Sequence, residues 1–319
     1  MVAISLTTPS PLEGEGWGGG RPRDSIMPLI LTPSILLPAL LNGIAMGAVY
    51  ALVALGLTLI YGVLHIINFA HGSLLMVALY GVYFLNTLLG IDPYLALPIV
   101  VPAMFALGYA LQRSVIATAS HGREENILLV TLGLSIIIDN FALYFWSSDT
   151  RTINPSYAFD TIDLGVAFIA VPKAVSFVAA LAITAVLWLG IQRTDLGKAI
   201  RALARERQGA RLVGIDVDHV FAMSFGIGTA CVGAAACLLL PSYYAHPGVG
   251  ESFVLIAFTI VVLGGMGSFL GALIGGLIIG VTESLGGLLL GETLGKIGIF
   301  AIFLIVLLFR PTGLFGQRA

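Results

Sequence analysis

Residues 61–85 read YGVLHIINFAHGSLLMVALYGVYFL, an apolar run of membrane-spanning length that is interrupted by Asn68, His71 and Gly72. An unpaired polar or backbone group at membrane depth costs several kcal/mol. Such a break is tolerated only where other protein groups or a water-filled path satisfy it. The stretch therefore predicts a membrane protein whose broken helix either lines a transport route or makes a polar contact between two packed helices.

The composition of the whole chain also indicates a membrane protein. Of the 319 residues, 58% are hydrophobic and 10% are charged, whereas a soluble domain carries roughly 25% charged residues. Apolar runs of about 20 residues, the length of a spanning helix, recur along almost the entire sequence. We therefore predict an all-α, polytopic membrane protein with about eight or nine transmembrane or re-entrant helices.

Loop signals separate the expected crossings from one another. They fall at about residues 35–61, 64–89, 94–117, 126–146, 172–192, 219–241, 268–290 and 295–309. A ninth apolar piece, residues 252–264, is short for a full span, and a re-entrant or half-crossing segment explains it equally well. The sequence shows no clear internal repeat.

The first 27 residues differ from the rest of the chain. They are rich in glycine and proline without periodicity, which is typical of disorder. They lack the basic start, apolar core and cleavage site of a signal peptide. An upstream start codon explains such a tail, with Met27 as the real first residue. We expect residues 28–319 to form a single transmembrane domain.

Basic residues mark the loops that we expect to face the cytoplasm. Residues 193–211 hold six of the fifteen lysines and arginines, and the segments 113–123 and 310–318 hold four more. The positive-inside rule assigns these segments to the cytoplasm. Residues 147–171 hold one arginine and three aspartates, so we expect an irregular or hairpin segment outside. This arrangement puts the N-terminus outside and the C-terminus inside, which requires an odd number of crossings.

Glycines at one-turn spacing predict close helix packing. The stripes are Gly43-x-x-x-Gly47, Gly267-x-x-x-Gly271-x-x-x-Gly275, Gly276-x-x-x-Gly280 and Gly287-x-x-x-Gly291-x-x-x-Gly295. Small residues let helix backbones approach closely in a bilayer, where van der Waals contact replaces the hydrophobic drive. Packing within one subunit is favoured over a dimer face. Between two apolar helices, Gly264, Gly265 and Gly267 form a turn that we interpret as a structural hinge.

The segment 195–213 predicts a short amphipathic helix on the cytoplasmic side, ending at Gly214. On a period of 3.6 residues one face carries Lys198, Arg201 and Arg205, and another carries Ile200, Leu203 and Ala204. Such a helix either docks in a groove of a cytoplasmic partner or rests on anionic lipid headgroups.

Acidic residues within the expected spans are candidates for contact with a transported molecule. Asp139, with its neighbour Asn140, and Glu283 lie past the midpoints of their crossings, toward the outer side. An acidic side chain in a span usually faces the bundle interior or a cavity. Glu283 is also explained by snorkelling or by pairing with a hydroxyl such as that of Thr282.

No enzyme motif is present in the sequence. The segment 291–297 resembles a phosphate loop, but it has three residues between its glycines and an isoleucine where Ser or Thr would reach magnesium. Cys231 and Cys237 indicate neither a disulfide framework nor a metal site. We expect no enzymatic activity, no cofactor, no metal and no nucleic-acid partner.

Four segments together resemble the branched-chain amino-acid ABC importer permeases of the LivH type. They are residues 42–56 (NGIAMGAVYALVALG), 67–72 (INFAHG), 201–215 and 262–276 (VLGGMGSFLGALIGG). The resemblance runs from about Leu41 to Gly313. It implies a multi-pass permease subunit in a bacterial inner (plasma) membrane, importing branched-chain or other small apolar amino acids. It also implies a second related permease, two cytoplasmic ATPases and a periplasmic substrate-binding protein as partners.

Transport and coupling are expected to depend on particular residues. The translocation pathway is expected to include Asn68, a neutral His71, Gly72, Asp139 and Asn140. Coupling to the ATPases is expected to involve Arg201, Ala202, Glu206, Ala210 and Gly214. Asp139 stands where members of this family usually carry an amide, which leaves urea or short amides as alternative substrates. A secondary transporter or channel is the alternative mechanism, although it would not need a projecting basic helix.

Overall fold

Helices make up most of the described part of the protein in the computed structural model. The model describes residues 32–120, 124–165, 167–310 and 312–316. The tail that we expect to be disordered, residues 1–27, lies outside the described residues. Within them, seven helices are long and apolar enough to cross a membrane, and two further apolar helices are shorter. The prediction of a polytopic helical membrane protein is therefore confirmed.

The helices follow the predicted spans within about three residues, except that the span predicted from residue 64 becomes helical only at Ala70, after the break. They are α2 (Pro33–Leu64), α3 (Ala70–Leu89), α4 (Leu97–Leu111), a π-helical turn (Gln112–Ile116), α5 (Ala117–Ser120), α6 (Glu124–Trp146), α7 (Val171–Arg193), α8 (Asp195–Arg205), α9 (Arg207–Leu212), α10 (Val217–Leu239), α11 (Val249–Gly264), α12 (Phe269–Leu290) and α13 (Glu292–Phe309). The π turn joins α4 and α5 into one continuous crossing. Expected and observed spans agree because each span is a long apolar run, and hydropathy alone identifies such runs.

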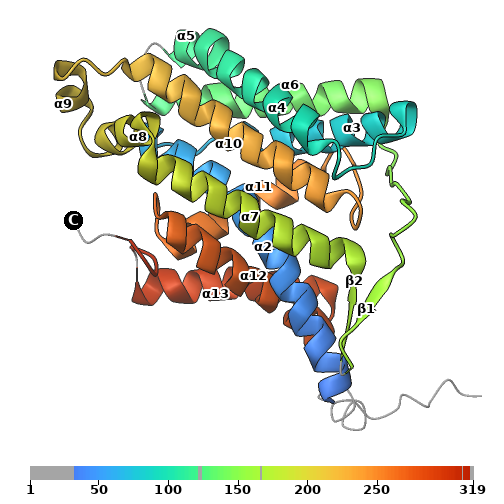
Figure 1. Cartoon of the computed structure of the whole chain (residues 1–319). Helices are drawn as coiled ribbons and strands as arrows, with labels where there is room; N and C mark the ends of the chain where they lie inside the picture. Colours follow the sequence, from blue (N-terminus) through green and yellow to red (C-terminus); the bar gives the residue numbers. More distant parts are fainter. Residues whose placement is uncertain (1–31, 121–123, 166, 311, 317–319) are drawn as a thin grey trace, which may run out of the picture.

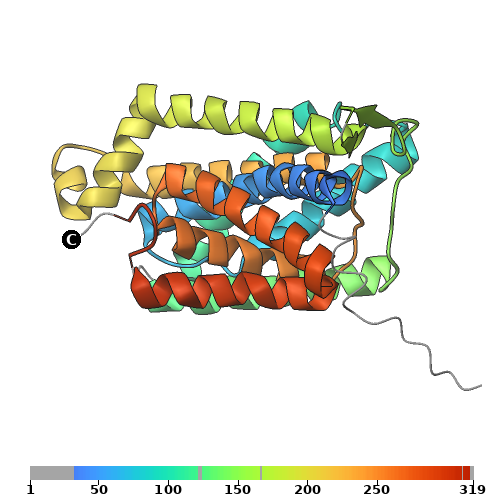
Figure 2. The same cartoon turned by 90° about the horizontal axis from the view of Figure 1, so that it is seen from below.

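The two ends of the helical bundle differ in charge. Helices α8 and α9 lie at one end, together with residues 312–316, which we call the C-terminal segment. Strands β1 (Thr161–Asp163) and β2 (Phe168–Ala170) lie at the other end (Figures 1 and 2). The first end carries the basic segment 193–211. By the positive-inside rule this is the cytoplasmic end, and the hairpin marks the outer end.

The outer end is held together by hydrogen bonds between its loops. β1 and β2 form an antiparallel hairpin, as the sequence predicts for this segment. The Tyr157 hydroxyl donates to the Asp92 carboxylate at 2.6 Å, and the Tyr94 hydroxyl donates to the Pro172 carbonyl at 3.0 Å. Burial, followed by the hydrogen bond to Asp92, raises the pKa of Tyr157, so its phenol stays protonated and remains a donor.

Helices α2 and α12 pack against each other through the predicted glycine stripes. A Cβ at Gly43 would stand 2.8 Å from the Val281 backbone, and one at Gly47 would stand 2.8 Å from the Gly276 carbonyl. Cβ atoms at Gly276 and Gly280 would in turn meet the backbone of α2. The prediction of close packing within one subunit is confirmed at this contact.

The helices α2–α3–α4 and α10–α11–α12 make reciprocal contacts across the molecule. Each member runs opposite to its counterpart, and α2 packs on α12 as α4 packs on α10. A Cβ at Gly56 would meet the Gly228 carbonyl, and one at Gly228 would meet the Gly56 carbonyl. Gly72 and Gly250 are related in the same way. This is the arrangement of an inverted repeat. The sequence shows no clear repeat, so the relation between the two halves is visible only in their contacts.

The short apolar helix α11 crosses from the bundle interior to the cytoplasmic end. It begins beside Gly72 and ends at Gly264, next to the C-terminal segment. The chain does not turn back to the outer end within this helix, so α11 is not a re-entrant loop. With α11 included, the described helices make nine crossings between the outer start of α2 and the cytoplasmic end of α13.

Candidate functional site at the broken helices

The break between α2 and α3 starts at the cytoplasmic end of α2 and leads the chain back into the membrane domain. Helix α2 ends with His65 in the left-handed conformation at φ 55°, and its amide donates to the Tyr61 carbonyl at 2.7 Å. Helix α3 starts at Ala70, beside Val53 of α2. Val53 lies 11 residues before the end of α2, or roughly 16 Å along a helix that rises 1.5 Å per residue. The chain therefore returns toward the membrane interior before α3 begins.

Asn68 and His71 are fully buried at this break. The Asn68 carboxamide oxygen accepts a hydrogen bond from the Ala70 amide at 3.1 Å, a local side-chain turn immediately before α3. His71 Nε2 lies 3.0 Å from the Val53 carbonyl. Among the described residues, no partner is found for Asn68 Nδ2 or His71 Nδ1. Neither side chain lines the cavity between α3, α6 and α11, and whether either one lines the transport route stays a prediction.

The first turn of α3 meets the first turn of α11 at two glycines. A Cβ on Gly72 would collide with the Gly250 carbonyl, and one on Gly250 would collide with the Gly72 carbonyl. Two helix N-termini thus converge inside the bundle, and each presents the positive end of its dipole. In many transporters the substrate site lies where such discontinuous helices meet.

A cavity of about 530 Å³ opens beside this junction, between α3, α6 and α11. Gly72 and Asp139 both line it. The hydroxyls of Ser73 and Ser135 are 2.7 Å apart, and Ser135 donates to Asp139 Oδ2 at 3.3 Å. No partner is found among the described residues for Asp139 Oδ1. The structure thus brings Gly72 and Asp139 together, although 66 positions separate them in the sequence.

Two carboxylates line this cavity, and only one of them is a sequence candidate. Glu251, in the first turn of α11, lines the same cavity as Asp139. It escaped sequence analysis because the apolar run that marks α11 starts at Ser252, so Glu251 counted as a loop residue. Asn140 is exposed and donates to the Ile136 carbonyl at 2.7 Å, and it does not line this cavity.

The predicted cytoplasmic helix 195–213 is wrong in one respect, because it is divided into α8 and α9. The chain is extended at Glu206, with φ −155° and ψ 107°, and the Glu206 carboxylate caps α9 by accepting from the Gln208 amide at 3.2 Å. The Arg207 guanidinium reaches the Leu64 carbonyl at the end of α2, at 2.8 Å. Anchoring to α2 and capping by Glu206 together favour a break over a continuous helix.

The five predicted coupling residues divide into two groups in the structure. Ala202, Glu206 and Gly214 are exposed, and Gly214 has a φ of 87° that favours glycine. Arg201 is half-buried and donates to the carbonyls of Ile191 and Gln192 at the end of α7, and Ala210 is buried. The first group is accessible to a partner, and the second group fixes α8 and α9 to the membrane domain. Two exposed apolar residues that the sequence did not single out lie beside Gly214: Leu212 and Val213.

The glycine turn between α11 and α12 is joined to the C-terminal segment. Gly265 and Gly267 have φ angles of 99° and 81°. The Leu314 amide donates to the Leu263 carbonyl at 2.8 Å, and the Phe315 amide donates to the Gly264 carbonyl at 3.0 Å. The turn is thus shaped by its glycines and held by the chain end. Whether it acts as a hinge stays a prediction.

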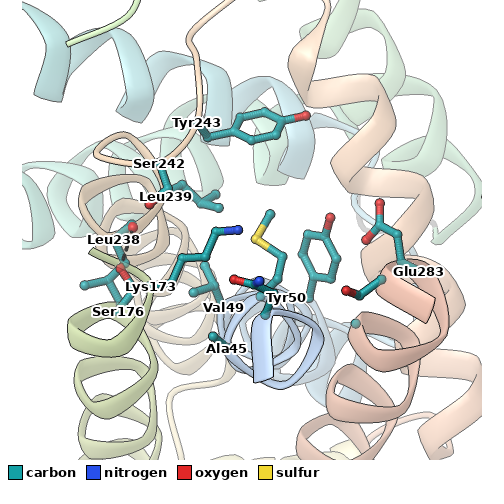
Figure 3. Close-up of a pocket in the computed structure, with 14 residues that line it drawn as sticks. Ala45, Val49, Tyr50, Lys173, Ser176, Leu238, Leu239, Ser242, Tyr243 and Glu283 are labelled. Carbon is teal, nitrogen blue, oxygen red and sulfur yellow. Dashed lines mark hydrogen bonds between the residues drawn. The ribbon is translucent and has the colours of Figure 1, made fainter. Parts of the chain in front are cut away.

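Glu283, the remaining acidic candidate, lies away from the broken helices. It lines a second cavity, at the outer end of α2 and α12 (Figure 3). The Tyr50 hydroxyl lies beside its carboxylate in this cavity (Figure 3). The sequence leaves three explanations for Glu283: contact with the transported molecule, snorkelling, or pairing with a hydroxyl such as that of Thr282. The Thr282 hydroxyl donates to the Ile278 carbonyl at 2.8 Å.

Comparison with known proteins identifies the family of this chain. The family described as "Branched-chain amino acid transport system / permease component" matches residues 39–308. The high-affinity branched-chain amino acid transport system permease proteins BraD of Pseudomonas aeruginosa and LivH of Escherichia coli K12 are 33% and 32% identical to it. Each alignment covers 88% of this chain and 96% of the relative.

A more distant relative comes from an archaeon, Methanocaldococcus jannaschii. Its probable branched-chain amino acid transport permease protein LivH is 31% identical over 83% of this chain and 88% of the relative. No solved structure matches the chain significantly. With the permease match over most of its length and its membrane-spanning helices, this multi-pass inner-membrane protein belongs to the branched-chain amino acid permease components of ABC transport systems.

Proposed function

We propose that the protein carries branched-chain or other small apolar amino acids into the cell, as one permease of an ABC importer. Its partners in this proposal are a second related permease, two cytoplasmic ATPases and a periplasmic substrate-binding protein. The named relatives, which act in branched-chain amino acid transport, support the substrate class. The ATPases supply the energy, because the chain itself carries no nucleotide-binding motif.

The observation that carries the proposal is the pair of carboxylates in the cavity at the broken helices. Asp139 and Glu251 line this cavity, which opens on a face of the subunit. The same face exposes apolar side chains such as Ile136 and Leu255. An ionisable side chain that faces lipid is costly, and such residues usually face protein or a water-filled cavity. The second permease therefore covers this face, and the route for the substrate runs between the two subunits.

Within this route the candidate residues have different tasks. Gly72 and Asp139 line the path, and Glu251 joins them. Asn68 and a neutral His71 stand behind the lining and hold the start of α3 in place. Asn140 reaches the path only if α6 rotates during the transport cycle.

Cysteine labelling tests this division. In a Cys231→Ala, Cys237→Ala background, Asp139→Cys in the assembled transporter should react with a small water-soluble thiol reagent. Asn68→Cys and His71→Cys should react slowly, or only during turnover. The opposite result, rapid labelling at positions 68 and 71 at rest with position 139 shielded, would contradict this division. Asn68 and His71 would then line the path and Asp139 would not.

Coupling to the ATPases depends on the exposed part of α8 and α9 in this proposal. Ala202 and Gly214 lie on the surface at the cytoplasmic end, beside the exposed Leu212 and Val213. A projecting pair of short helices with small and apolar exposed residues suits a groove on a partner protein. Basic side chains on the same segment also attract anionic headgroups, so the lipid surface is the alternative contact.

Uptake competition with the complete transporter tests the substrate class. The complex, reconstituted in vesicles with its binding protein, should import labelled leucine in an ATP-dependent manner. Unlabelled branched-chain amino acids should compete, whereas urea, short amides and lysine should not. Uptake of urea or an amide with no uptake of leucine would leave the importer class intact and replace the substrate. Leucine uptake that needs an ion gradient and no ATP would favour a secondary transporter.

A further inference from the structure

The second cavity lies at the outer end of the bundle, where four helices contribute to its wall (Figure 3). Its volume is about 260 Å³. The wall is formed by the outer part of α2, the first turns of α7, the end of α10 with the loop that follows it, and the outer part of α12. Pockets for drug-sized ligands measure roughly 300–1,000 Å³, so this cavity suits a smaller molecule.

Side chains of opposite charge flank the cavity. Lys173 of α7 and Glu283 of α12 lie on opposite sides, with the ring of Tyr50 between them (Figure 3). The Tyr50 hydroxyl lies beside the Glu283 carboxylate (Figure 3). The Lys173 ammonium points toward the middle of the cavity, and it has no hydrogen bond or ion pair with any other residue that the structure describes. A charge in such an environment calls for a partner.

The remainder of the wall is mostly apolar, and its tyrosines are held in position. The apolar residues are Ala45, Met46, Val49, Leu238 and Leu239. Phe253 is buried and packs edge-on against both Tyr50 and Tyr243, at ring-centroid distances of 5.7 and 5.5 Å. One buried ring thus fixes two tyrosines of the wall, which gives the cavity a defined shape.

We propose that this cavity binds the transported amino acid as a zwitterion on the outer side of the membrane domain. The Lys173 ammonium binds the carboxylate, Glu283 and the Tyr50 hydroxyl face the amino group, and the apolar wall receives the aliphatic side chain. A simple anion would be repelled by the negative charge of Glu283. A simple cation would be repelled by the positive charge of Lys173. A zwitterion satisfies both ends. This inference rests on the proposed function, because it places the same substrate at a second site.

Binding of leucine to the complete transporter without its binding protein provides the test. The complex is placed in nanodiscs of phosphatidylglycerol, which lack a zwitterionic headgroup that might compete for the cavity. Lys173→Met and Glu283→Gln should each weaken binding of labelled leucine at least about tenfold, since each removes one hydrogen-bonded charge. Lys296→Met removes a lysine from the start of α13, outside the cavity, and should bind leucine as the wild type does.

A third variant blocks the cavity and leaves both charges in place. Ser242 is exposed and lines the cavity, so Ser242→Trp should abolish leucine binding while the complex still assembles. Wild-type affinity in the assembled Ser242→Trp complex, or equal losses in Lys173→Met and Lys296→Met, would overturn the inference. Vesicle uptake separates the two proposals. If the wild type imports leucine but Lys173→Met and Glu283→Gln leave its KM unchanged, the site is wrong and the function stands. If the wild type imports no leucine, the proposed function fails.

Discussion

Gly72 shows how one residue fixes the junction of the two broken helices. Any side chain there would collide with the Gly250 carbonyl, whereas a Cβ on Gly81, nine residues later in α3, would meet no atom within 4 Å. We expect Gly72→Ala to lower the free energy of unfolding of the assembled complex by about 1–3 kcal/mol, the usual cost of overpacking. Gly81→Ala should stay within about 0.5 kcal/mol of the wild type. Thermal unfolding of the purified complex measures both, and equal stability of the two variants would contradict the close contact.

At the scale of the element, the surface of α8 and α9 exposes the small residue Ala202 among charged side chains, with the apolar Leu212 and Val213 next to Gly214. Ala202→Trp and Gly214→Val should reduce ATP-dependent uptake at least about tenfold. A loss of about 1.4 kcal/mol in the free energy of binding to the ATPase corresponds to a tenfold change. ATP hydrolysis by the complex should continue. Ala110→Trp makes the same change at another exposed position near the cytoplasmic end, on α4, and should leave uptake intact. Normal uptake in both coupling variants would remove this surface from the mechanism.

The turn between α11 and α12 gives a second prediction at this scale. Valine at Gly265 would have to adopt a φ of 99° and would press against the backbone of the C-terminal segment. We expect Gly265→Val to lose about 1–3 kcal/mol of stability through strain, and to reduce assembly or transport without changing the nucleotide affinity of the complex. Met266→Val changes an exposed neighbour and serves as the control. Nucleotide binding to the isolated subunit would show instead that the glycines form a phosphate site.

At the scale of the whole molecule, the inverted repeat predicts coupling between its two halves. Gly56 and Gly228 face each other's carbonyls across the contact of α2 with α10. Gly56→Ala and Gly228→Ala should each destabilise the protein, and the double variant should depart from additivity by 0.5–3 kcal/mol. Gly190→Ala, where a Cβ would meet no atom within 4 Å, should add independently to either change. Strict additivity of the first pair would argue that the halves do not pack as described.

Candidate residues could be predicted from the sequence only where a rare residue type stands in an apolar background. Asp139 and Glu283 stand out in this way, and the structure brings each of them to a cavity. Lys173 and Glu251 were missed because they lie near the ends of their helices, where charged residues are ordinary. His71 was recognised as unusual, but its burial against Val53 depends on α2 and α3 packing together.

The sequence by itself determined the nine apolar segments, the basic cytoplasmic end and the glycine stripes, because each is a local pattern of residue types that the bilayer selects. Only the tertiary structure decided where those segments meet. Gly72 and Gly250 meet where α3 contacts α11, Asp139 shares a cavity with Glu251, and Lys173 and Glu283 line opposite sides of another cavity. Each of these contacts joins residues far apart in the chain. Such contacts follow from the path of the backbone through three dimensions, and no local pattern in the sequence records them.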